Sequence, residues 1–144
     1  MSEELKKSVV SGVLVKRDDG KFLLVKKANN AGPYAGTYLT PGGGVETGES
    51  ADSAVLRELY EETGVRVKNL KRTYFDDDVT ENWEGVKRHF IMLLYTADYE
   101  SGEIQQTEGN DDEFEDVGWY SIDELKKMKL SSPLEKLLKF ERII

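Results

Sequence analysis

One acidic segment, from Gly43 to Val65, constrains the fold of this chain more than any other part of its sequence. It reads GGVETGESADSAVLRELYEETGV and combines a glycine-rich start, an acid at Glu49, the run Arg57-Glu58-Leu59 and the pair Glu61-Glu62. Glycines let a backbone take unusual torsions and come close to a ligand. The glycine that follows the acidic pair stands in the usual stop position of a helix. The segment therefore predicts a glycine-rich loop that leads into a helix of roughly residues 50 to 63.

Three glutamates of this predicted helix project from one face. At about 100° per residue, with Glu58 at 0°, Glu62 falls near +40° and Glu61 near −60°. The negative charges of these three carboxylates repel one another unless a positive charge lies among them. Clustered carboxylates are hard oxygen ligands that suit Mg²⁺ or Mn²⁺, and Mg²⁺ is commonly held by a few carboxylates together with substrate phosphate oxygens. The sequence therefore predicts a divalent metal site and a phosphate compound as the substrate.

The spacing of these residues, G-x5-E-x7-R-E-U-x-E-E-x-G-U with Leu59 and Val65 at the aliphatic positions U, resembles the complete signature of the Nudix hydrolases. The resemblance implies an α/β fold, the Nudix α/β/α sandwich with a central mixed β-sheet, over nearly the whole chain. It implies that Glu49 and Arg57 pair to brace the loop against the helix. It also implies a set of metal ligands, namely the carbonyl of Gly42 and the carboxylates of Glu58, Glu61 and Glu62.

The catalytic residues that this resemblance implies include a general base, which similar enzymes place either on the helix or on a later loop. On the helix, Glu58 and Glu62 are the favoured metal ligands, and Glu61 is a ligand or the base. In the later loop, Glu113 is the favoured acid because related proteins often carry an extra metal-binding glutamate just ahead of the strand that here bears Trp119. The other acids of that loop are Glu108, Asp111 and Asp112.

Elsewhere the sequence predicts an antiparallel hairpin from residues 8–15 and 22–25, with a turn at Asp18-Asp19-Gly20. Further strands are expected at residues 66–74, 87–95 and 114–120, with an acidic loop over 76–85 and a polar stretch over 99–112. Two capping boxes, at Ser121 and Ser132, predict short helices, the second with Pro133 at its first position. On the long helix, Val55, Leu56 and Leu59 are expected to pack against the sheet.

Composition fits one compact domain over residues 1–144. A chain of 144 residues can bury roughly 70% of the surface that it exposes when unfolded. It has no cysteine, which excludes disulfides and thiolate zinc sites. Neither a signal peptide nor a membrane span is apparent, so we expect a cytoplasmic protein without a membrane partner, as a monomer or simple homodimer. The net charge of −8 argues against non-specific binding of DNA or RNA.

Candidate substrate contacts are fewer and rest on position alone. Lys26 and Arg88 lie at strand ends where they can meet phosphates, with Lys27 and Lys87 as alternatives. Tyr38 stands just before the glycines, at a position where many Nudix relatives have tryptophan. The only histidine, His89, sits between Arg88 and Phe90 on an expected strand and is interpreted as structural.

These features favour a metal-dependent pyrophosphohydrolase that cleaves a diphosphate bond in a nucleoside diphosphate linked to another group. Among small-molecule nucleotide substrates, a slight preference goes to nucleoside triphosphates, oxidised ones included, which would give a nucleoside monophosphate and pyrophosphate. ADP-ribose and nucleotide sugars are the alternatives. A non-catalytic nucleotide-sensing module would be expected to lack part of the acid cluster, and every acid is present. An acidic protein that binds a basic partner is a third hypothesis.

Overall fold

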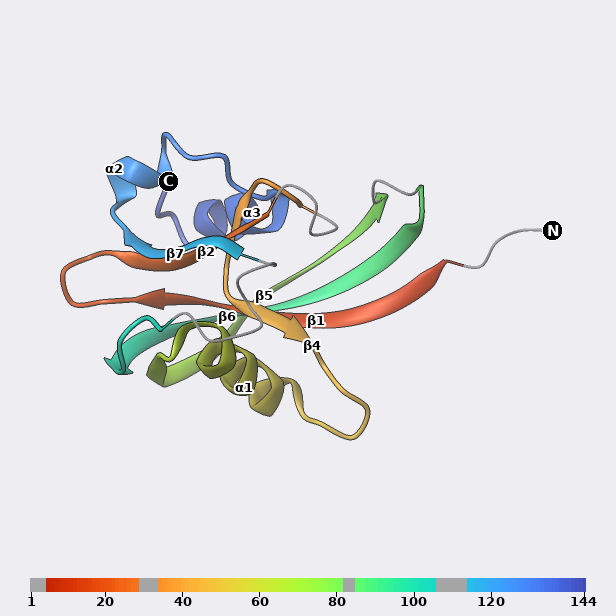
Figure 1. Cartoon of the computed structure of the whole chain (residues 1–144), viewed down its shortest axis with the longest axis horizontal. Helices are drawn as coiled ribbons and strands as arrows, with labels where there is room; N and C mark the ends of the chain where they lie inside the picture. Colours follow the sequence, from red (N-terminus) through yellow and green to blue (C-terminus); the bar gives the residue numbers. More distant parts are fainter. Residues whose placement is uncertain (1–4, 29–33, 82–84, 106–113) are drawn as a thin grey trace.

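A curled, mixed β-sheet forms the centre of the computed structural model, which describes residues 5–28, 34–81, 85–105 and 114–144. Figure 1 shows the helix α1 (Ala51–Thr63) below the sheet and the helices α2 (Ile122–Leu125) and α3 (Ser132–Phe140) above it. The predicted α/β/α sandwich is confirmed. The strands are β1 (Lys6–Lys16), β2 (Phe22–Lys27), β3 (Tyr38–Leu39), β4 (Gly42–Gly44), β5 (Arg66–Glu81), β6 (Lys87–Ser101) and β7 (Phe114–Tyr120).

The order of the strands places β1 at the middle of the molecule. The main path of the sheet is β3-β2-β1-β6-β5, with β4 paired to β1 and β7 paired to β2. Only the β1–β6 pair is parallel among the described strand pairs, and its register runs from Lys6 opposite Arg88 to Lys16 opposite Asp98. The expected hairpin of β1 and β2 is present, but its two strands pair only beside the turn. Beyond that point the edge of β1 is free to receive β4.

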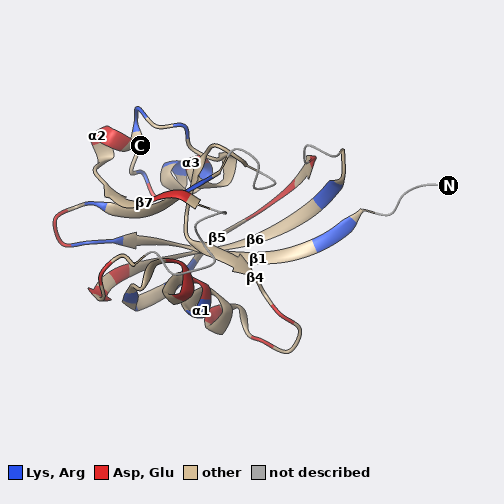
Figure 2. Cartoon of the chain, viewed as in Figure 1, with Lys and Arg blue, Asp and Glu red and all other residues tan. Residues whose placement is uncertain are grey.

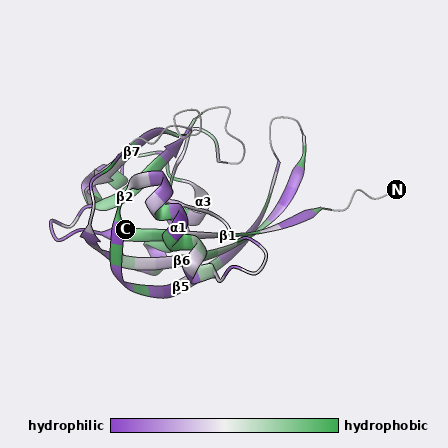
Figure 3. Ribbon diagram, turned by 60° about the horizontal axis from the view of Figure 1, so that its bottom comes forward, coloured by the Kyte–Doolittle hydropathy of each residue, from purple (hydrophilic) through white to green (hydrophobic). Residues whose placement is uncertain are grey.

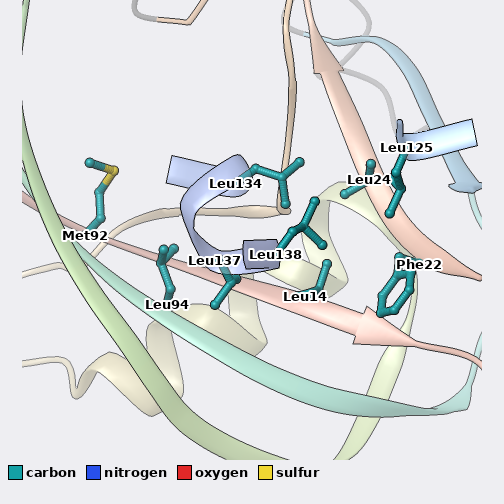
Figure 4. Packing of buried hydrophobic residues seen from close by; sticks show 9 residues of the cluster. All are labelled: Leu14, Phe22, Leu24, Met92, Leu94, Leu125, Leu134, Leu137 and Leu138. Atoms are coloured by element: carbon teal, nitrogen blue, oxygen red, sulfur yellow. The ribbon is translucent and has the colours of Figure 1, made fainter. Parts of the chain in front are cut away.

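Two apolar clusters fix the helices to opposite faces of the sheet. Figure 4 shows the first, in which Leu134, Leu137 and Leu138 of α3 pack on strand residues such as Leu14 and Leu24. The second lies under α1, where Val55 and Leu59 meet Val13, Val15 and Leu23. Because successive side chains of a strand point to opposite faces, β1 and β2 supply both clusters from alternating positions. Figure 3 shows this central band of apolar residues.

Helix α1 begins and ends where the sequence predicts. The Ser50 hydroxyl accepts a hydrogen bond from the Ser53 amide at 3.1 Å, which caps the first turn, and Gly64 closes the last turn with φ 77°. One expectation for this helix is wrong, because Leu56 is 42% exposed, whereas Val55 and Leu59 are buried. Leu56 lies at the border of the apolar stripe, beyond the reach of the sheet.

The cap of α3 also differs from the prediction. Ser131, not Ser132, is the N-cap, and its hydroxyl accepts from the Leu134 amide at 3.3 Å. The preceding prediction is confirmed, because Ser121 and Glu124 form a reciprocal capping box at the start of α2. The displaced cap brings Ser131 to a buried position beside β3, where its amide donates to the Tyr38 carbonyl at 2.9 Å.

The predicted acidic loop over 76–85 is wrong for residues 76–81, which continue β5. Each of its three aspartates has a side-chain partner. Asp76 pairs with Lys136 of α3 at 3.1 Å, Asp77 with His89 at 2.8 Å, and Asp78 accepts from the Tyr34 hydroxyl at 2.7 Å. The polar stretch expected from residue 99 likewise begins as strand, because β6 runs to Ser101 and pairs with Arg66. Strand β6 thus offers a continuous partner that outweighs the local turn-like composition.

Two leucines of α1 provide a test of how this helix packs on the sheet. Replacing the buried Leu59 by alanine removes apolar contacts and leaves a cavity, so we expect the free energy of unfolding to fall by about 2–5 kcal/mol. Leu56→Ala, a matched control on the exposed side of α1, is expected to change it by less than about 1 kcal/mol. Urea unfolding followed by circular dichroism measures both. Equal losses in the two variants would contradict the assigned orientation of α1.

Candidate active site

The glycines of β4 bring three elements closer together than side chains would allow. Strand β4 pairs antiparallel with β1, with Gly42 opposite Gly12 and Gly43 opposite Ser11. A Cβ atom at Gly42 would lie 1.9 Å from the Ser11 carbonyl oxygen, and one at Gly43 would lie 2.7 Å from the Glu58 carboxyl carbon. The absence of side chains on β4 therefore allows the backbone of this strand to touch β1 on one side and the acidic face of α1 on the other.

Arg57 links the loop that precedes α1 to the acids of the helix. Its Nε and Nη2 donate to the two carboxylate oxygens of Glu49 at 2.9 and 3.0 Å, a bidentate geometry. Its Nη1 donates to Glu58 at 3.1 Å and to Glu61 at 3.3 Å. The hydrogen bonds from Arg57 hold the pKa of Glu49 below its usual value, and in turn the pKa of Arg57 is raised. One guanidinium thus supplies positive charge to three carboxylates.

Glu62 occupies a different environment from the other two acids of α1. It is only 7% exposed, and its Oε2 accepts a hydrogen bond from the Gly42 amide at 3.2 Å. The side chains of Glu58 and Glu61 are 21% and 56% exposed. The exposure of the three glutamates therefore increases from Glu62, which is buried beside the glycine backbone, through Glu58 to Glu61, which reaches into solvent. Figure 2 shows the acidic segments of α1 and the position of this helix beside β4.

The oxygen atoms at this corner match the ligand preferences of a hard divalent cation. Across the described parts of the chain, however, no three acidic or histidine side chains converge closely enough to hold a metal ion on their own. Glu58 and Glu61 turn toward Arg57, and Glu62 turns toward Gly42. The favoured base of the later loop, Glu113, lies outside the described residues, as do Glu108, Asp111 and Asp112.

A cavity of about 280 Å³ opens from this corner between the sheet and α3. Gly42, Gly43 and Glu62 line one end of it. Polar groups of Ser11, Tyr34, Thr40 and Ser131 also reach it. Apolar side chains form most of its walls, namely Val10, Val25, Leu39, Phe90, Met92, Phe114, Pro133 and Leu134. A site with one acidic end and apolar walls suits a ligand that joins phosphates to a flat organic group.

The structure separates the predicted substrate contacts by whether they line the cavity. Lys27 lines the cavity together with Val25, whereas Lys26 does not and forms an ion pair with Glu115 at 3.2 Å. Tyr38 also stays outside the cavity, because its hydroxyl donates to Asp116 at 3.0 Å, while the next residue, Leu39, lines it. Arg88 is exposed, two residues along β6 from the cavity residue Phe90.

Four polar residues of the cavity were not among the sequence candidates, namely Ser11, Tyr34, Thr40 and Ser131. Tyr34 has a positive φ of 62° and donates through its hydroxyl to Asp78, and burial together with this hydrogen bond raises its pKa. Ser131 reaches the cavity as the N-cap of α3. The sequence carried a visible signal for Ser131, namely the pair Ser131-Ser132 before Pro133. Nothing in the local sequence distinguishes Tyr34, because its role depends on the extension of β5.

No helix in the described ranges combines the length and the apolar character needed to cross a bilayer.

Comparison with known proteins agrees with this architecture. The sequence profile of the NUDIX domain matches residues 6–139. The chain is 33% identical over 132 residues to an ADP-ribose pyrophosphatase of Methanocaldococcus jannaschii, covering 90% of this chain and 69% of that protein. It is 39% identical over 113 residues to the NAD-capped RNA hydrolase NudC of Chromobacterium violaceum, covering 78% of this chain. The match spans only 37% of that relative's length.

Among solved structures, the crystal structure of a MutT NUDIX hydrolase from Burkholderia pseudomallei superimposes with a TM-score of 0.78 at 30% identity. The superposition covers 93% of this chain and 97% of that one. The expected family resemblance is therefore confirmed by sequence and by structure. With the acid-bearing α1, the glycine strand β4 and a match over residues 6–139, the chain belongs to the Nudix hydrolase family.

Proposed function

We propose that this chain is a divalent-metal-dependent pyrophosphohydrolase that cleaves a diphosphate bond in a nucleoside diphosphate linked to another group. The observation that carries the proposal is the position of Gly42, Gly43 and Glu62 at one end of a largely apolar cavity. That arrangement offers oxygen ligands where a diphosphate would lie and apolar walls where a nucleoside would lie. Family membership supports the reaction class.

Glu58, Glu61, Glu62 and the carbonyl of Gly42 are the residues that would hold Mg²⁺ or Mn²⁺. The bound cation would neutralise charge on the diphosphate and lower the pKa of the attacking water. Glu62 is kept in place by the Gly42 amide, and Glu58 lies against the backbone of Gly43. Because Arg57 already bonds Glu49 on the loop, the acids of α1 are positioned before substrate arrives. Such preorganisation reduces the rearrangement that the reaction requires.

Proton transfer is assigned to a carboxylate that can exchange protons with solvent. Glu61 is the most exposed of the three helix acids and lies one turn from Arg57, which donates to it at 3.3 Å. It is the proposed base on the helix, and Glu113 is the alternative on the later loop. A general base must lie within hydrogen-bond reach of the proton that it removes, directly or through one water.

ADP-ribosyl compounds are the first choice of substrate. One relative is named an ADP-ribose pyrophosphatase and another an NAD-capped RNA hydrolase, and both names point to an adenosine diphosphate joined to a second group. Nucleoside triphosphates, oxidised ones included, are the second choice, supported by the likeness to a MutT NUDIX hydrolase.

The proposed activity is tested by incubating the purified chain with a substrate panel, with and without Mg²⁺ or Mn²⁺, and identifying products by mass spectrometry. The panel holds ADP-ribose, NAD, nucleotide sugars and ordinary and oxidised nucleoside triphosphates. We expect metal-dependent cleavage within the diphosphate, fastest for ADP-ribosyl compounds. Faster turnover of a triphosphate would reverse the order of the two substrate classes. Binding of these compounds without any cleavage would instead favour a nucleotide-sensing module.

Glu62→Gln tests the role of the buried acid. The amide keeps the size of the side chain but removes a charged oxygen ligand, so kcat/KM is expected to fall by at least about a hundredfold while the fold is kept. Glu115→Gln on β7 is the control, because Glu115 pairs with Lys26 outside the cavity. Steady-state rates with thermal melting of each variant measure both effects. Full metal-dependent turnover by Glu62→Gln would remove Glu62 from the metal site.

Gly43→Ala tests the close approach of β4 to α1. The added methyl group would meet the Glu58 carboxylate, so this side chain must move and the apparent Mn²⁺ affinity should fall by about tenfold or more. Gly44→Ala is the matched control, because a Cβ atom there has no neighbour within 4 Å. Electron paramagnetic resonance of free Mn²⁺ gives the affinity without any need for turnover. Equal affinities in the two variants would show that Glu58 does not bind the metal.

A further inference from the structure

Three strands continue past the cavity as an arm. Figure 1 shows the ends of β1, β5 and β6 projecting together beyond α1 and α3, toward the N-terminus. The cavity residues Val10, Phe90 and Met92 lie where this arm joins the body. In the parallel register Val10 is opposite Met92, and Ser8 is opposite Phe90. The face of the arm that these residues occupy is therefore a direct continuation of the cavity wall.

Two residues beyond Phe90 on the same face, away from the cavity, two cationic side chains lie on neighbouring strands. Lys6 of β1 is opposite Arg88 of β6, and Thr80 of β5 is opposite Arg88 on its other side. Because residues two apart on a strand share a face, Arg88 lies on the side of Phe90, about 7 Å farther from the cavity. Lys6, Arg88 and Thr80 thus form a row across three strands at the outer edge of the cavity wall.

The two cations of this row are unusual in so acidic a chain. Both are exposed, and among the described residues no acid lies within ion-pairing distance of either. Figure 2 shows the basic bands at the ends of β1 and β6. Like charges directly opposite each other on neighbouring strands destabilise a sheet. The net charge of the chain is −8, so this repulsion is not a consequence of a general excess of cations.

A buried hydroxyl also lies beside the two cations. The Thr80 hydroxyl oxygen is buried and has no hydrogen-bond partner within the described structure, and such groups are rare in folded proteins. Among the described residues, the nearest acid on the same face is Asp78, which is opposite Phe90 and accepts the hydrogen bond of Tyr34. An anion beside Lys6 and Arg88 would relieve their repulsion.

We propose that Lys6 and Arg88, with Thr80 beside them, bind a phosphate group on the part of the substrate remote from the cleaved diphosphate. The proposal rests on the proposed function, because it takes the cavity as the nucleoside site. A nucleoside against Phe90 would direct a further phosphate on its ribose toward Arg88. That phosphate belongs either to a small dinucleotide phosphorylated on its ribose or to the first internucleotide linkage of a nucleotide chain.

Binding measured without turnover tests the site. Isothermal titration calorimetry in Ca²⁺ at fixed ionic strength compares three probes that share a diphosphate: NAD, NADP with its ribose phosphate, and NAD extended at the adenosine 3′-hydroxyl by two nucleotides. We expect the phosphate-bearing probes to bind the parent protein about five to ten times more tightly than NAD. A gain for NADP alone identifies the small dinucleotide, and a gain for the extended probe alone identifies the nucleotide chain.

The matched variants use neighbouring positions on the same two strands. Lys6→Gln/Arg88→Gln removes the charges on the cavity side and is expected to abolish the gain, leaving NAD affinity as in the parent. Lys7→Gln/Lys87→Gln removes two charges from the opposite face and is expected to keep the gain. Thermal melting checks folding, and the first variant should be at least as stable as the parent because a repulsive pair is removed.

Two results would overturn the proposal: no gain for either phosphate-bearing probe in the parent, or an equal loss of the gain in both double variants. The second result would show that net charge, not the row, attracts the phosphate. Failure of the proposed function looks different, because the extra phosphate can then still bind at the row while no panel compound is cleaved.

Discussion

The arrangement of the whole acidic corner depends on one guanidinium. Arg57 binds Glu49 in a bidentate manner and reaches two acids of its own helix, so it connects a loop that has no regular structure to the most regular element of the chain. Without a cation at this point, Glu49, Glu58 and Glu61 would repel one another. The position of the loop, and with it the position of β4, follows from this local balance of charge.

The second constraint is the division of the sheet into two faces. Alternating residues of β1 and β2 supply one cluster under α1 and another under α3, so neither helix can shift without disturbing a strand that also serves the other. Neighbouring residues also differ in whether they meet the cavity. Lys27 and Leu39 line it, whereas Lys26 pairs with Glu115 and Tyr38 donates to Asp116.

Those parts of the structure that depend on local chemistry could be predicted from the sequence. The spacing from Gly43 to Val65 predicts the helix, its stop and the acids that it carries, because each follows from helical periodicity or a cap. The length of β5 could not be predicted, since Asp76, Asp77 and Asp78 extend it by pairing with β6 and have Lys136, His89 and Tyr34 as side-chain partners. These partners are distant in sequence. Which of Lys26 and Lys27 lines the cavity could not be predicted for a related reason, because it depends on how β2 packs in the folded chain.

The glycine strand has a consequence for how this site can change over time. At Gly42, Gly43 and Gly44 the cavity is bounded by backbone atoms, which substitutions on other elements leave unchanged. The remaining walls come from side chains on separate elements, including β1, β6, β7 and α3. Single substitutions on those walls can therefore reshape the cavity for a new organic group while the acidic corner stays intact. Because one end of the cavity is backbone and its walls are side chains, the same fold could come to bind different organic groups while its acidic residues stay the same.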